Sequence, residues 1–78
     1  MEYITVYTND LSSDKGAQAK ALEELKAGNA VSIGSTCIGH TRAQVVGRQG
    51  INFMRQHGAH EVQAPEELSW VEEPFFAV

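Results

Sequence analysis

Alternation of apolar and polar residues predicts a β-strand at the start of the chain. Residues 2–8 place Ile4 and Val6 on one face and tyrosine and threonine on the other, and such β-branched and aromatic residues favour strands. A short apolar run at 30–33 predicts a second, central strand, and residues 59–63 predict a weaker third one. Longer segments with a different periodicity separate the three.

The segments between these strands have the periodicity of helices. In residues 14–27, small and apolar side chains recur every four residues, and Gly28-Asn29 ends the pattern. The turn-forming residues 9–13 supply a helix cap, which leaves Asp14 in the first turn. A second helix is predicted from 41 to about 57, with this core face: Ala43, Val46, Gly50, Phe53 and Met54.

The order of the elements predicts a small two-layer α/β domain, β-α-β-α-β, with two helices and three or four strands. We expect residues 1–78 to form this single domain, because a chain of 78 residues leaves no room for a second core. Right-handed crossovers make the first three strands parallel, with both helices on one face if the strands are added in one direction.

The last residues, 64–78, form an acidic and aromatic tail that starts with a short helical turn. Trp70, Phe75 and Phe76 are too apolar to remain in water, so we expect the tail to dock. It completes the core or adds an edge strand limited by Pro74, or it docks on a second subunit or a partner.

Charge is distributed unevenly along a chain whose net charge is −4. Residues 41–58 contain three arginines and no acid, whereas residues 59–78 contain five glutamates and no Lys or Arg. An acidic segment of this kind favours a basic partner and argues against direct binding of nucleic acid. One cysteine, no apolar run of 18 residues and no signal-peptide pattern predict a cytoplasmic protein.

The segment from Gly34 to Arg42 is a candidate anion-binding loop. Its G-x-x-x-x-G-x-T spacing is that of a loop whose backbone N–H groups bind phosphate, but His40 stands where lysine would be. This alternative assigns a phosphate- or nucleotide-binding module, or a minimal enzyme, to these residues: Gly34, Ser35, Thr36, Gly39, His40, Thr41 and Arg42.

Other chemistry at this loop lacks the required spacing. Cysteine phosphatases need five residues between cysteine and arginine, and Cys37 and Arg42 have four between them. A lone cysteine is more often a small buried hydrophobic residue. His57 and His60 have neither the i,i+4 spacing nor a C-x₂-C partner, so no metal site is predicted.

The segment ITVYTNDLSSDKGAQAKAL, residues 4–22, is similar to the start of glutaredoxins, in which a strand ending in Tyr-Thr precedes a C-x-x-C turn and a helix. The resemblance implies a thioredoxin-like scaffold in the first half of the chain. Ser12 and Lys15 hold the positions of the two cysteines, so the resemblance implies no dithiol exchange.

These observations favour a binding protein over an enzyme, with no cofactor and no catalytic residue assigned. We expect a small inhibitor or accessory protein, of the type that phages and mobile elements encode, that occupies a partner protein with a basic surface, such as a nucleic-acid-binding protein. A second copy of the chain is an alternative partner, which would give a homodimer. We expect no contact with a membrane. The predicted contact residues lie in the acidic and aromatic segment: Glu61, Glu66, Glu67, Trp70, Glu72, Glu73 and Phe75.

Overall fold

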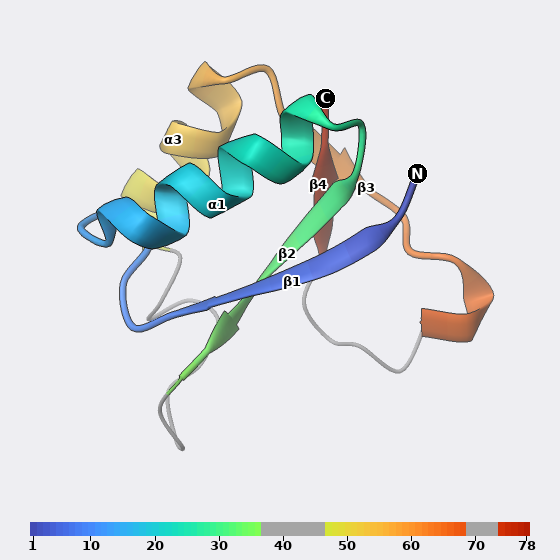
Figure 1. The fold of residues 1–78 in the computed structure, drawn as a ribbon, viewed down its shortest axis with the longest axis horizontal. Helices are drawn as coiled ribbons and strands as arrows, with labels where there is room; N and C mark the ends of the chain where they lie inside the picture. The colour runs from blue at the N-terminus through green and yellow to red at the C-terminus, as the bar shows by residue number, and fades with distance from the viewer. Residues whose placement is uncertain (37–46, 69–73) are drawn as a thin grey trace.

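The chain folds into an α/β domain, seen in a computed structural model that describes residues 1–36, 47–68 and 74–78 (Figure 1). Within these residues there are two helices and a four-stranded mixed sheet, which confirms the predicted fold class. The elements follow in this order: β1 (Tyr3–Thr8), α1 (Lys15–Lys26), β2 (Ala30–Ser35), α3 (Gly47–Gln56), β3 (His60–Val62), the 3₁₀ turn η1 (Glu66–Leu68) and β4 (Phe75–Ala77).

The sheet has the strand order β1-β2-β4-β3. β1 and β2 are parallel over their full length, from the pair Tyr3 and Ala30 to the pair Thr8 and Ser35. β4 is antiparallel to both β2 and β3. The first three strands therefore run in one direction, as predicted, and the last strand runs against them.

The C-terminal strand β4 lies inside the sheet, between β2 and β3. The tail thus completes the core, as one prediction stated, but the alternative of an edge strand is wrong. The crossover from β2 through α3 to β3 leaves room for one strand, and the continuous apolar run of β4 suits burial on both faces. Pro74 precedes the strand, where its missing N–H removes no ladder hydrogen bond.

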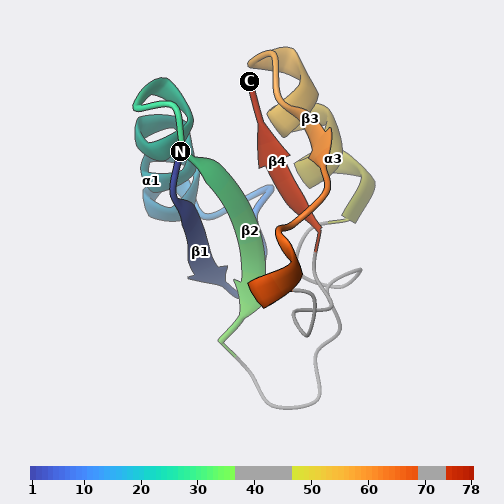
Figure 2. The ribbon, with the colours of Figure 1, turned by 90° about the vertical axis from the view of Figure 1, so that its right-hand side faces the viewer.

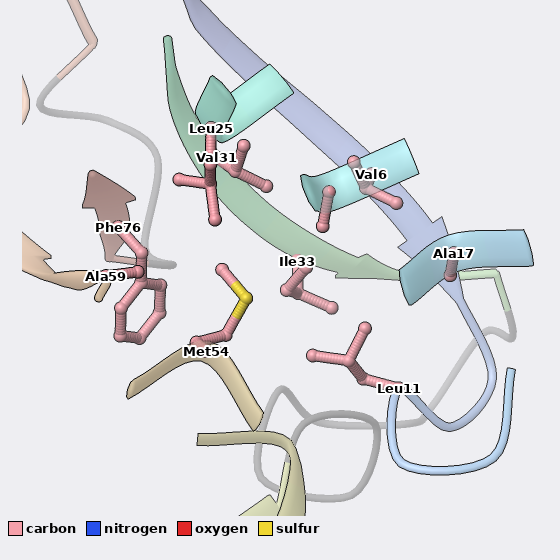
Figure 3. Packing of buried hydrophobic residues seen from close by; sticks show 10 residues of the cluster. Val6, Leu11, Ala17, Leu25, Val31, Ile33, Met54, Ala59 and Phe76 are labelled. Atoms are coloured by element: carbon pink, nitrogen blue, oxygen red, sulfur yellow. The ribbon is translucent and has the colours of Figure 1, made fainter. Parts of the chain in front are cut away.

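Both described helices cover the same face of the sheet, so the domain has two layers (Figure 1). The residues of α1 that recur every four positions, Ala17, Ala21 and Leu25, are buried against the sheet. Figure 3 shows the resulting core, in which side chains from α1, α3 and alternate strand positions meet. Its buried members are Val6, Leu11, Ala17, Ala21, Leu25, Val31, Ile33, Met54, Ala59 and Phe76.

The opposite face of the sheet has a smaller apolar cluster. Phe75 is 2% exposed and packs edge-on against Tyr3, with ring centroids 5.1 Å apart. Val62, Ala64 and Leu68 pack against the same cluster. The turn η1 therefore lies on the side opposite to the helices, as Figure 2 also shows.

The second helix is described from Gly47, so the predicted start at 41 and two core positions, Ala43 and Val46, lie outside the described residues. Within the described part, Gly50 and Met54 are buried as predicted. The helix continues through Gly50 without a break. None of the helices in the described part of the chain is long and apolar enough to cross a membrane.

Candidate functional site

The carboxyl ends of β1 and β2 meet at one edge of the sheet, where ligands often bind in α/β proteins. At this edge, Thr8 ends β1 and its side chain is 1% exposed. Its hydroxyl donates a 2.8 Å hydrogen bond to Asp14 Oδ2 and accepts a 3.2 Å bond from the Asp10 backbone N–H. One buried hydroxyl thus joins the strand, the following turn and the start of α1.

Asp14 is the N-cap of α1. Its Oδ1 accepts a 3.0 Å hydrogen bond from the Ala17 backbone N–H. The predicted cap within residues 9–13 is therefore one residue too early. The Ala17 N–H, and after it the Thr8 hydroxyl, lower the pKa of Asp14 because both bonds stabilise the ionised carboxylate. The positive end of α1 already has its own counter-charge.

Asp10 organises the turn between β1 and α1. Its carboxylate accepts hydrogen bonds from the Ser12 hydroxyl at 2.7 Å, the Ser13 hydroxyl at 3.0 Å and the Ser12 backbone N–H at 3.1 Å. The Ser12 hydroxyl, and after it the Ser13 hydroxyl, lower the pKa of Asp10. Ser12 therefore stabilises the turn between β1 and α1.

Only the first three residues of the predicted anion-binding loop are described, so the loop stays a prediction. Gly34 and Ser35 belong to β2, which is two residues longer than predicted. A Cβ atom at Gly34 would lie 2.8 Å from Cε1 of Tyr7, so this glycine makes room for the tyrosine ring. The Thr36 hydroxyl donates a hydrogen bond to Asn9 Oδ1.

The remaining residues of that loop lie outside the described residues: Cys37, Gly39, His40, Thr41 and Arg42. The described part of this edge carries two carboxylates with lowered pKa, Asp10 and Asp14. A phosphate placed here would face two negative charges, and the N-terminus of α1 is capped. Two ionised carboxylates disfavour an anion at the start of α1.

The described glutamates of residues 59–78 lie on the edge strand β3 and on η1, which covers the face opposite to the helices (Figure 2). Glu61 is exposed on β3, and Glu66 and Glu67 are exposed on η1. We call these three residues the acidic surface. Trp70, Glu72 and Glu73 lie outside the described residues.

The prediction that Phe75 contacts a partner, in contrast, is wrong. Its side chain is in the core against Tyr3, so it cannot contact a partner in this fold. Its assignment to a contact surface treated an aromatic residue near the end of the chain as exposed, whereas β4 lies inside the sheet.

The described histidines do not assemble a metal site. The His57 ring packs against Phe53, with ring centroids 4.9 Å apart, and His60 is exposed on β3. Across residues 1–36, 47–68 and 74–78, no three His, Cys, Asp or Glu side chains group closely enough to hold a metal ion.

Two buried hydroxyls were not singled out from the sequence, and their hydrogen bonding differs. Thr8 has the two bonds described above. Ser32, on β2, is fully buried, and its Oγ has no hydrogen-bond partner within the described part of the chain. Ser32 could have been found in the sequence as a polar residue inside an apolar strand run. Thr8 and Asp14 could have been found from their spacing at a strand-to-helix turn.

We expect Thr8→Val and Ser32→Ala to change stability in opposite directions. Thr8→Val leaves a carboxylate and a backbone N–H without their partner, so the free energy of unfolding should fall by about 1.5–3 kcal/mol. Ser32→Ala removes an unsatisfied buried hydroxyl, so the free energy of unfolding should rise by about 1 kcal/mol. Urea unfolding followed by circular dichroism measures both.

The two variants control for each other, since each removes one buried hydroxyl from adjacent strands. Destabilisation by Ser32→Ala would show that its hydroxyl has a partner, and a neutral Thr8→Val would show that the Thr8 bonds contribute nothing.

Comparison with known proteins gives no relative. No family model, no curated protein and no solved structure matches the chain. A functional assignment therefore rests on the residues of this chain alone.

Proposed function

We propose that this protein acts by occupying a basic surface of a partner protein through its acidic surface, as an inhibitor or accessory protein does. The observation that carries the proposal is the position of Glu61, Glu66 and Glu67. All three are exposed on consecutive elements, β3 and η1, in a segment, residues 59–78, that contains no Lys or Arg. A segment with this excess of negative charge attracts a basic surface.

The local structure exposes these glutamates on its surface. η1 is held to the sheet by Leu68 and Ala64, which pack on the second face, while its two glutamates remain exposed. A surface fixed to a sheet in this way loses little conformational entropy when it binds, which favours affinity. The alternative, a phosphate-binding loop at 34–42, stays a prediction, because 37–42 lie outside the described residues.

Charge reversal tests the proposal. Wild type and the single variants Glu61→Lys and Glu66→Lys are immobilised, and proteins retained from a lysate of the source organism are quantified by mass spectrometry. We expect a basic protein to bind wild type and to bind each variant about three- to tenfold more weakly, because a lost ion pair becomes a repulsive pair. Higher salt should weaken the wild-type interaction as well.

Glu23→Lys is the matched control, because Glu23 is exposed on α1 and its reversal changes the net charge equally. The control should retain the partner at the wild-type level. The proposal fails if no protein distinguishes wild type from the two tail variants, or if Glu23→Lys loses the partner to the same extent.

A further inference from the structure

The outer side of β1 is an open sheet edge. β1 stands at one end of the strand order and pairs on its other side with β2 (Figure 2). The Ala30 N–H donates to the Glu2 carbonyl at 2.8 Å, and the Thr36 N–H donates to the Thr8 carbonyl at 3.3 Å. In a parallel pair the bonding residues alternate, so even-numbered residues of β1 bond to β2. The N–H and C=O groups of Tyr3, Thr5 and Tyr7 therefore point outward.

This edge lacks the features that usually prevent strands from pairing between molecules. Edge strands are protected by shortness, by charged side chains or by proline. β3, at the other edge, is three residues long and carries Glu61. β1 is six residues long, YITVYT, with neither a charged residue nor a proline. The two edges differ, and β1 is the one able to accept another strand.

The residues of β1 are close to symmetric about Thr5: tyrosine stands two positions away on each side, and a β-branched aliphatic residue stands one position away. We propose that β1 pairs antiparallel with β1 of a second copy, with a two-fold axis at Thr5. Thr5 then faces Thr5 of the second copy, Ile4 faces Val6, and Tyr3 faces Tyr7. These are β-branched and aromatic cross-strand pairs, which stabilise antiparallel strands.

Backbone geometry selects the same register. With the axis at Thr5, each outward residue lies opposite an outward residue: Tyr3 opposite Tyr7 and Thr5 opposite its own copy. Each of these pairs can exchange an N–H and a C=O in both directions. An axis at Ile4 or Val6 leaves one of the three outward residues of β1 without such a partner. The axis at Thr5 gives all three of them hydrogen-bond partners.

The exposed fractions of the two tyrosine side chains of β1 agree with this arrangement. Tyr7 is 64% exposed, although it is a large aromatic residue in a strand, whereas Tyr3 is half-buried against Phe75. The pairing brings the Tyr7 ring beside Tyr3 of the second copy and removes apolar surface from water. The dimer forms at the edge opposite to β3, so it leaves Glu61 of the acidic surface accessible on each copy.

The mass of the protein in solution is the first test. Size-exclusion chromatography with light scattering over a range of concentrations should give a mass approaching twice the chain's 8.5 kDa. Thr5→Lys places two like charges against each other at the axis, and Tyr7→Lys removes an aromatic pair, so both should give the mass of one chain. Gln49→Lys adds the same charge at an exposed position of α3 and should remain a dimer.

Amide hydrogen exchange in the unmodified protein locates the interface without any substitution. The N–H groups of Tyr3, Thr5 and Tyr7 should be protected at high concentration and exchange faster on dilution. Those of Ile4, Val6 and Thr8, bonded to β2, should be protected at both concentrations and serve as an internal control.

Three results would overturn the proposal: a single-chain mass at every concentration, a dimer that Thr5→Lys and Tyr7→Lys leave intact, or outward amides that exchange rapidly within the dimer. With a single-chain mass, the open edge of β1 would instead be able to pair with an extended peptide of another protein. Loss of the lysate partner in the charge-reversal experiment leaves this test unaffected, because the substituted glutamates lie on β3 and η1 and not on β1.

Discussion

Phe75→Ala should destabilise the domain by about 3–5 kcal/mol, the usual cost of truncating a buried phenylalanine. Phe75 is 2% exposed and lies in β4, where it packs against Tyr3 of β1 and fills the cluster beneath η1. A domain of this size has a total stability of about 4–12 kcal/mol, so one substitution removes a large share of it. Urea unfolding followed by circular dichroism measures the loss.

Val78→Ala is the matched control, because Val78 is apolar, three positions away and 69% exposed. It should change stability by less than about 0.5 kcal/mol. If Phe75→Ala proves too unstable to purify, Phe75→Leu retains much of the volume and should give a smaller loss. A Phe75→Ala protein as stable as wild type would contradict the position of β4 inside the sheet.

Much of the fold could be predicted from local pattern. The strand predicted at 2–8 and the helix at 14–27 match β1 and α1 within one or two residues, because alternation and four-residue periodicity are encoded locally. The position of β4 could not be predicted in the same way. Its three residues carry no alternation, and their place between β2 and β3 depends on pairing with residues far away in the sequence.

The candidate site shows the same limit. Gly34 was assigned to an anion-binding loop from its spacing alone. The sequence could not show that its lack of a side chain makes room for the ring of Tyr7, a contact that only the β1–β2 register creates. Phe75 looked exposed because it is near the end of the chain, whereas the strand order buries it. Exposure of Glu61 and Glu66 was predicted correctly because charged side chains remain in water wherever the chain allows it.

Met54→Ala should destabilise the domain by about 2–5 kcal/mol and should loosen α3 from the sheet. Met54 is fully buried, and Figure 3 shows it reaching from α3 toward the strands, between Phe76 and Ile33. Gly50, the other buried residue in the described part of this helix, has no side chain, and Ile51 and Phe53 pack against the core but are only partly buried. Met54 is therefore the main apolar anchor of α3, and its loss leaves a cavity that the rigid strands cannot fill.

Helix α3 allows a close control for this substitution. Arg55 is the next residue, is exposed and lies on the same helix, so Arg55→Ala should change stability by less than about 0.5 kcal/mol. Amide exchange adds a local measurement: in Met54→Ala, the amides of α3 should lose more protection than those of β1 and β2. Equal loss in all elements would show instead that α3 unfolds only together with the sheet, and an unchanged stability would show that Met54 does not anchor the helix.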